Sequence, residues 1–192
     1  LNGPALALAA ANAGFSVTII DALPMAKRSL RDFDGRSYAL ALTSQRLLQG
    51  IGVWDAVSIH AQPMLEIKVT DGRAGEGAAP WMMHFDHIEI EEGPMGFLVE
   101  DRHLRAAFLA AMDGSKLITQ IDSARVIAQK VRPNGVTVTL DNSDTVSGRL
   151  LVGSDGRASG TARRAGIKRV GWGYDQTAVV CAVEHDKSHC GI

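Results

Sequence analysis

Residues 1–21 have a composition and an order of residue types that few folds can accommodate. The Ala- and Leu-rich segment after Gly3 predicts a helix, and Gly14 predicts its end. Residues 17–20 have the β-branched composition of a strand, and the acidic residue Asp21 follows them. Helix, strand and acid in this order are typical of the second half of a dinucleotide-binding βαβ unit.

Gly3 and Asp21 are the candidate cofactor-binding residues of this unit. Gly3 matches the third glycine of the dinucleotide fingerprint, where a helix N-terminus faces the pyrophosphate. Asp21 lies 18 positions after Gly3, close to the spacing of about 20 expected for an acid that binds the adenosine ribose. The alternative is an ordinary Ala-rich helix followed by a solvated Asp. The first strand and two earlier glycines would precede Leu1, so we expect the chain to be a piece of something longer.

Composition excludes several classes of function. The net charge is −1 and no concentrated basic surface is evident, which argues against a nucleic-acid partner. No apolar run reaches the ~20 residues of a membrane span. Two cysteines, Cys181 and Cys190, are too few for a disulfide scaffold, so we expect a reducing, cytoplasmic location.

The rest of the chain mixes helices with strands of antiparallel character. We therefore predict a mixed α/β class, not a simple doubly wound domain. A helix capped by Thr43 or Ser44 and a hairpin turn at Pro133–Gly135 are expected. We expect strands at 64–70, 81–85, 96–100, 117–121, 124–131, 136–140, 150–153 and 179–183. The second helix should end near residue 50, and the third should span 101–114. The expected loops are 34–42 and 71–80.

Four segments in fixed order resemble the FAD-dependent aromatic hydroxylases of the para-hydroxybenzoate hydroxylase type. The most similar branch is that of ubiquinone biosynthesis, the octaprenyl-methoxyphenol hydroxylases. The resemblance covers essentially the whole chain, and the order and spacing of the segments make it specific. The segments are the one ending in Asp21, D-G-R-S-Y-A-L at 34–40 with Ser44 and G-V-W-D at 52–55, V-E-D-R-H-L-R at 99–105, and L-V-G-S-D-G-R-A-S at 151–159, followed by G-W-G-Y at 171–174.

The resemblance implies a fold and a domain division. The fold would be a Rossmann-like FAD-binding domain of the glutathione-reductase type with part of an antiparallel-sheet substrate domain. Residues 1–61 and 99–168 would form the FAD-binding domain. Residues 62–98 and 169–192 would contribute to the substrate domain.

The resemblance also assigns further cofactor-binding residues. Arg36 and Arg102 would be the flavin-side arginines, and Asp155-Gly156 would lie near the pyrophosphate in a motif linked to both FAD and NAD(P)H. The residue types suit a diphosphate, which backbone N–H groups and arginines bind well. The alternatives are salt-bridged arginines and a simple Asp-Gly turn. The chain departs from the family at Ala162, where an arginine is common.

By resemblance, the parent protein would be a monooxygenase that hydroxylates the aromatic ring of a polyprenylated phenol in ubiquinone biosynthesis. NAD(P)H would reduce FAD, and O2 would form a flavin C4a-hydroperoxide that the ring attacks. The residues identify no catalytic acid or base, and the family's later G-D-A-A-H segment would lie beyond Ile192, so we expect the chain alone to be inactive and to bind FAD poorly. The alternatives are a related hydroxylase of another aromatic substrate and a non-catalytic nucleotide- or partner-binding remnant.

Three further expectations concern partners and ligands. The resemblance is compatible with peripheral contact with the inner membrane and with a place in a quinone-biosynthesis complex. We also expect association between chains in a homo-oligomer, because the parts expected outside residues 1–192 would otherwise cover sheet edge and apolar surface. The spacing of Cys181, His185, His189 and Cys190 could hold a metal, but we expect a strand and loop of the substrate domain instead and no metal. Several apolar residues would be core or sheet face, with a prenyl-binding lining as the alternative: Met82, Met83, Phe85, Met95 and Phe97.

Overall fold

The computed structural model describes residues 1–73 and 75–192, which divide into two compact units. The first unit comprises residues 1–30 and 108–179, and the second comprises residues 31–107 and 180–192. Helix α5 (Asp101–Asp113) begins in the second unit and ends in the first. The division into FAD-binding and substrate domains expected from the sequence stays a prediction.

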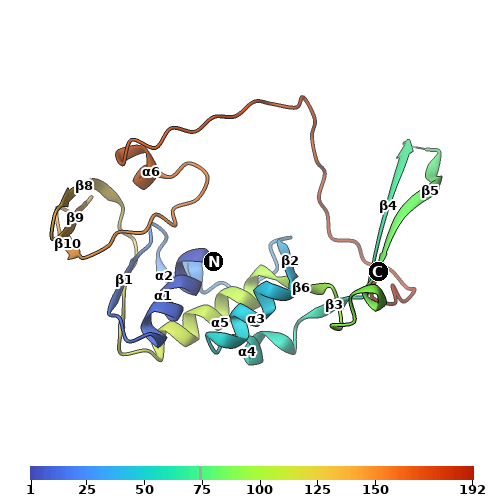
Figure 1. Ribbon diagram of the computed structural model, residues 1–192, viewed down its shortest axis with the longest axis horizontal. Coiled ribbons are helices and arrows are strands. Elements are labelled where there is room, and N and C mark those ends of the chain that lie inside the picture. The colour runs from blue at the N-terminus through green and yellow to red at the C-terminus, as the bar shows by residue number, and fades with distance from the viewer. Residues whose placement is uncertain (74) are drawn as a thin grey trace. The chain divides into compact units, whose positions relative to one another are not determined.

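The first unit is built on a helix and two parallel strands. Helix α1 (Asn2–Asn12) buries a face of small and apolar side chains that includes Leu8, and Gly14 at φ +85° lies just beyond its end. Strand β1 (Val17–Ile20) pairs in parallel with β7 (Ile118–Ile121). The helix and strand predicted for residues 1–21 are therefore confirmed (Figure 1).

A three-stranded antiparallel sheet completes the core of the first unit. Strands β8 (Val126–Arg132), β9 (Gly135–Leu140) and β10 (Thr145–Gly148) lie in the order β10-β9-β8 (Figure 1), and β10 was not predicted. The turn between β8 and β9 lies where Pro133–Gly135 predicted it. Alternate residues of β9 are buried, and the cluster they form with Ala124 packs against Ile20 and Ile121. The short helices α2 (Met25–Arg28) and α6 (Gly160–Arg164) belong to the same unit.

Two predicted strands, 150–153 and 179–183, do not form. Leu150 is 80% exposed and Val180 is 87% exposed, and within the described residues no strand pairs with either segment. An apolar, β-branched run favours extended backbone, but a strand is stable only when a neighbour satisfies its N–H and C=O groups.

The second unit holds a three-stranded antiparallel sheet covered by helices. Strands β2 (Ser37–Ala41), β6 (Gly96–Glu100) and β3 (Gln62–Met64) lie in the order β2-β6-β3. Helices α3 (Leu42–Gly50) and α4 (Trp54–Ser58) belong to the same unit. The side chains that are almost fully buried in this unit are Val53, Val57, Val99 and Leu104. The predicted loop 34–42 was wrong over β2, because pairing with β6 decides that segment. Ala41 occupies the N-cap position of α3, so neither Thr43 nor Ser44 caps it.

A long hairpin extends the second unit. Strands β4 (Glu66–Arg73) and β5 (Gly77–Asp86) pair antiparallel and are followed by the short helix η1 (His87–Ile90) (Figure 1). The predicted loop 71–80 was wrong over most of its length because both strands continue into it; Ala74 lies outside the described residues. The pairing places Ile67 opposite Phe85 and Val69 opposite Met83, so one face of the hairpin is apolar.

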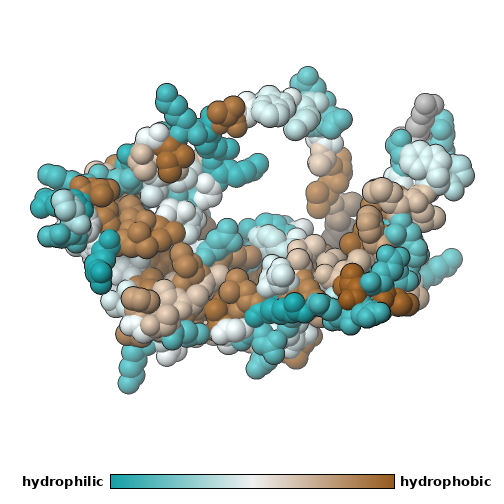
Figure 2. Space-filling model, in the orientation of Figure 1, coloured by the Kyte–Doolittle hydropathy of each residue, from teal (hydrophilic) through white to brown (hydrophobic). Residues whose placement is uncertain are grey.

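Many apolar side chains lie at the surface and appear as brown patches in Figure 2. On the hairpin, Met83 is 56% exposed and Phe85 is 46% exposed, so these residues form a sheet face and not a core. Phe97 instead packs edge-on against Trp54, with ring centroids 4.9 Å apart.

Candidate functional site

Gly3 lies where α1 meets the end of the residue run 151–154. A Cβ placed on Gly3 would lie 3.5 Å from the Cβ of Ser154 and 3.6 Å from the Cδ1 of Ile19. These are ordinary contact distances, so packing alone does not require glycine at this position. The structure brings Gly3 next to the motif that contains Asp155 and next to the strand that ends before Asp21.

Asp21 lies directly after β1, and both of its carboxylate oxygens have partners within the protein. Oδ1 accepts a hydrogen bond from the Leu23 N–H at 2.9 Å, and Oδ2 lies 3.6 Å from Nε of Arg28. The Asp21 side chain is 40% exposed to solvent. A carboxylate held in this way still has free lone pairs for hydroxyl donors on a ligand.

Arg28, which the sequence did not single out, supports Asp21 from the protein interior. It is only 7% exposed, and its Nη2 donates to Oε1 of Gln120 on β7 at 2.9 Å. Its Nη1 is buried and has no hydrogen-bond partner among the described residues. A buried arginine in a short polar segment gives no sequence signal, because its burial depends on β7, more than ninety positions away along the chain.

The Asp155-Gly156 motif forms a compact network with the start of α6. The Asp155 carboxylate accepts hydrogen bonds from the Ser159 hydroxyl, the Thr161 N–H at 3.0 Å and the Thr161 hydroxyl at 3.1 Å. Ser159 in turn caps α6 by accepting from the Ala162 N–H at 3.0 Å. Gly156 has φ +80°, a conformation that favours glycine. The carboxylate therefore orders this loop as well as being a candidate for ligand binding.

The Asp155 network predicts a loss of stability in strong acid. Burial acts to raise the pKa of Asp155, but the hydrogen bonds from Ser159 and Thr161 outweigh it and lower the pKa from 3.8 to about 2. The stabilisation is therefore present above pH 3.8 and is lost as the pH falls toward 2. Melting curves from pH 5 to pH 2 should fall less steeply for Asp155→Asn than for the wild type, and parallel curves would contradict the assignment.

Arg36 is anchored on the side of its guanidinium that carries Nε and Nη2. Nε and Nη2 donate to Asp34 at 2.9 and 2.6 Å, and Nη2 also lies 3.0 Å from Oδ2 of Asp101. The side chain is 55% exposed, and no described residue hydrogen-bonds to Nη1. An arginine held on one edge and open on the other can bind an anionic oxygen.

Arg102 belongs to the same unit and lies one residue after Asp101. Its Nε donates to Oε2 of Glu100 at 2.5 Å, and its guanidinium carbon lies 5.7 Å from the ring centroid of Phe33. The salt-bridged alternative considered for both predicted arginines therefore describes their contacts in this structure. It does not exclude ligand binding, because each guanidinium retains further donors.

His103, the residue after Arg102, stacks on His60 in the second unit. The ring centroids lie 3.7 Å apart with an interplanar angle of 12°. Burial lowers the pKa of His103 below its usual 6.5, and the charges of His60 and Arg102 lower it further, although Glu100 opposes them.

We expect a pH-dependent loss of stability from His103. Because the unfolded chain binds the proton more readily, its contribution is present above pH 6.5 and is lost as the pH falls below that value. Melting temperatures measured between pH 8 and pH 5 should decline less for His103→Gln than for the wild type. An identical decline in both proteins would show that His103 is not responsible.

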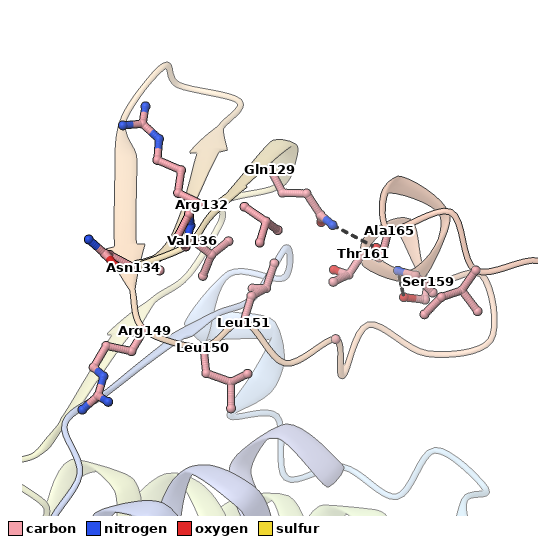
Figure 3. Close-up of a pocket in the computed structure, with 16 residues that line it drawn as sticks. Gln129, Arg132, Asn134, Val136, Arg149, Leu150, Leu151, Ser159, Thr161 and Ala165 are labelled. Atoms are coloured by element: carbon pink, nitrogen blue, oxygen red, sulfur yellow. Dashed lines mark hydrogen bonds between the residues drawn. The ribbon is translucent and has the colours of Figure 1, made fainter.

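A pocket of about 710 Å³ lies in the first unit between the β8–β9 hairpin and α6 (Figure 3). Gln129 bridges this space by donating to the Thr161 carbonyl and by accepting from Nε of Arg164. Ser159 and Thr161 line the pocket and also bind Asp155. None of the six predicted cofactor residues lines it, so it is not the predicted cofactor site.

The predicted cofactor residues fall into two groups. Gly3, Asp21, Asp155 and Gly156 belong to the first unit, and Arg36 and Arg102 belong to the second. Within the first unit, Gly3 is in contact range of Ser154. Within the second, Asp101 contacts Arg36 and directly precedes Arg102, although no separate role was predicted for it. Its position at the first turn of a helix after a strand was the available signal.

The described part of the chain was compared with the requirements of a metal site and of a membrane-spanning helix. No group of three or more His, Cys, Asp or Glu side chains there could hold a metal ion. His185 and His189 contact each other edge-on, with centroids 5.7 Å apart. Over residues 1–73 and 75–192, no helix is both long and apolar enough to cross a bilayer.

Curated relatives match this chain over almost its entire length. It is 41% identical to the ubiquinone hydroxylase UbiL of Rhodospirillum rubrum over 191 residues, covering 100% of this chain and 43% of that protein. It is 28% identical to the 3-demethoxyubiquinol 3-hydroxylase of Escherichia coli, covering 95% of this chain and 46% of that protein. The chain thus spans less than half the length of these relatives. No family model matches it.

Solved structures with a similar fold include flavin-dependent monooxygenases. A probable FAD-dependent monooxygenase of Pseudomonas aeruginosa, PqsL, matches with a TM-score of 0.69 at 19% identity over 88% of this chain and 43% of that chain. The flavin-dependent monooxygenase PieE, solved with FAD and substrate, matches with a TM-score of 0.66 at 20% identity over 85% of this chain and 30% of that chain. The predicted mixed α/β, Rossmann-like class is confirmed by these folds.

Proposed function

We propose that this chain, which is homologous over its whole length to the ubiquinone hydroxylases, binds FAD as part of a monooxygenase that hydroxylates the ring of a phenolic ubiquinone precursor. The observation that carries the proposal is the clustering of Gly3, Ser154 and the end of β1 at one edge of the first unit. This edge combines a helix start with the strand end that precedes Asp21, as dinucleotide sites do.

The residues present fit FAD. Asp21 offers a carboxylate for ribose hydroxyls, and Asp155 offers one beside a glycine turn. Arg36 presents an exposed guanidinium whose Nη1 has no partner among the described residues. An adenine dinucleotide requires these donor and acceptor types for its ribose and its diphosphate.

The cofactor and the protein residues would have different roles in the reaction. FAD, when bound and reduced by NAD(P)H, supplies the oxygen chemistry of such enzymes. Asp21 would hold the adenosine ribose, and Arg36 and Arg102 would bind polar oxygens of the cofactor. Asp155 would orient its own loop through Ser159 and Thr161 as well as contact the ligand. No described side chain is assigned as a catalytic acid or base.

The polyprenylated character of the substrate finds support in the β4–β5 hairpin. Its apolar face carries exposed side chains that could cover an isoprenoid tail, namely Ile67, Val69, Trp81, Met83 and Phe85. Methionine and aromatic side chains adapt well to irregular apolar ligands. We propose this face as the tail-binding side of the substrate domain.

The test uses protein expressed from the complete reading frame that encodes this chain. We expect it to purify with a flavin absorption spectrum, to oxidise NADH or NADPH faster when a prenylated phenol is added, and to yield a product carrying one additional oxygen atom by mass spectrometry. Flavin binding with hydroxylation of only unprenylated aromatic acids would point to a different aromatic substrate. Protein that binds no flavin would overturn the proposal.

A further inference from the structure

Asp101 is a buried carboxylate at the first position of α5, and it collects contacts from another part of the chain. It is 3% exposed, and its Oδ1 accepts a hydrogen bond from the Tyr38 hydroxyl at 3.0 Å. Its Oδ2 lies 3.0 Å from Nη2 of Arg36 and 3.1 Å from Nη2 of Arg105. Its backbone N–H donates to the Arg36 carbonyl at 3.0 Å. Burying a carboxylate is costly unless it is paired, so this position is strongly specified.

The contacts at Oδ2 are ion pairs between one buried carboxylate oxygen and two guanidinium groups. Neither arginine meets hydrogen-bond geometry at this oxygen, so the attraction there is chiefly electrostatic. The backbone bond fixes the Arg36 main chain at the same time. Asp101 therefore contacts Arg36 at two points, at its main-chain carbonyl and at Nη2 of its guanidinium.

Asp34 also binds Arg36, but from a different environment. Its side chain is 42% exposed, whereas that of Asp101 is 4% exposed. Exposed ion pairs contribute little because water screens them and both side chains remain mobile. Asp101 is therefore the partner that can fix the orientation of the guanidinium.

We propose that Asp101 is a positioning residue that holds the Arg36 guanidinium in place, so that its Nη1, which has no partner among the described residues, can bind the cofactor. This inference rests on the proposed function, because it takes FAD as the ligand of Arg36. Asp101 acts through Arg36 and does not itself bind the cofactor.

Positioning and simple electrostatics predict opposite results when the charge of Asp101 is removed. A negative charge beside an anion site opposes anion binding, so its removal by Asp101→Asn would tighten FAD binding if only charge mattered. If Asp101 positions Arg36, the same substitution loosens the guanidinium and weakens FAD binding. We expect weakening by about tenfold, the equivalent of about 1.4 kcal/mol.

The experiment measures the FAD dissociation constant by flavin fluorescence in full-length protein. Asp34→Asn is the matched control: it removes a negative charge from the exposed side of the same guanidinium, and we expect its affinity to stay within about threefold of the wild type. Equal or tighter binding by folded Asp101→Asn overturns the inference while leaving the proposed function intact. A wild-type protein that binds no FAD overturns both.

A double-mutant cycle separates positioning from a general structural role. In an Arg36→Lys background, Asp101→Asn should have no further effect on FAD affinity, since the group it positions is gone. Equal weakening in both backgrounds would show a merely structural role and overturn the inference. If circular dichroism shows that Asp101→Asn does not fold, Asp101→Glu replaces it in the same cycle, because it keeps the charge but moves the carboxylate.

A spectroscopic measurement tests the contact without any cofactor. Burial raises the pKa of Tyr38 above its usual 10.0, and the hydrogen bond to Asp101 and the charge of Asp101 raise it further. The chain has two tyrosines, so Tyr38→Phe identifies the Tyr38 step in an ultraviolet titration. That step should shift to lower pH in Asp101→Asn, and an unshifted step would contradict the geometry on which the inference depends.

Discussion

Replacing Leu140 by alanine should destabilise the first unit by about 2–5 kcal/mol. Leu140 is 1% exposed at the end of β9, and it belongs to the buried cluster with Ala124, Val136 and Val138. Ile20 and Ile121, at the ends of β1 and β7, pack against this cluster. The loss of stability has two parts: the apolar side-chain atoms are no longer buried, and a cavity remains. The cavity persists because strands held by hydrogen bonds to their neighbours cannot move together to fill it.

The measurement is thermal unfolding followed by circular dichroism. At about 2–4 °C per kcal/mol for a protein of this size, the melting temperature should fall by roughly 4–20 °C. Val131→Ala is the matched control, because Val131 lies on the neighbouring strand β8 but is 74% exposed, and its effect should stay within about 0.5 kcal/mol. Equal effects of the two substitutions would mean that the cluster is not the core of this unit.

Replacing Asp21 by asparagine should weaken FAD binding by about ten- to hundredfold in the full-length protein. A hydrogen bond to a charged group contributes about 1.5–3 kcal/mol, and asparagine keeps the size of the side chain while losing its charge and one acceptor. The contact with the Leu23 N–H can persist in the variant, so the local fold should be retained. The loss should therefore appear in affinity and not in the circular dichroism spectrum.

Asp55→Asn is the control for Asp21→Asn. Asp55 is an exposed acid in the first turn of α4, so its replacement makes the same change of charge away from the predicted cofactor residues. Its FAD dissociation constant should match that of the wild type. Unchanged affinity in Asp21→Asn would remove Asp21 from the ribose site, and unfolding of that variant would assign it a structural role beside Arg28.

Local patterns predicted the elements whose stability is mostly local. The Ala-rich run and Gly14 specified α1, and the amphipathic segment after Glu100 specified α5. The turn at Pro133–Gly135 specified the β8–β9 connection. Strand 37–41 was missed because its alternation is short and its partner β6 lies far along the chain.

The candidate site was predictable in part for the same reason. Gly3 lies at a helix start, Asp21 follows a strand end and Asp155 lies in the loop before α6, and at all three positions a motif specifies residue type and spacing. Arg28 carried no sequence signal, and the signal for Asp101 was only its position at the first turn of a helix after a strand. In neither case does the local sequence show that the charge will be buried. Their partners, Gln120 in one case and Tyr38 in the other, come from distant segments.

The class of fold, the resemblance to flavin-dependent hydroxylases and the residue types expected around a dinucleotide could all be derived from the amino-acid sequence alone. Helix propensity, glycine conformation and motif spacing are local properties, so they can be read along the chain. The folded structure was needed to show which charges support the candidate site. It buried Arg28 beside Asp21 and placed Asp101 against Arg36, because ion pairing in a protein interior depends on contacts between segments that the sequence keeps far apart.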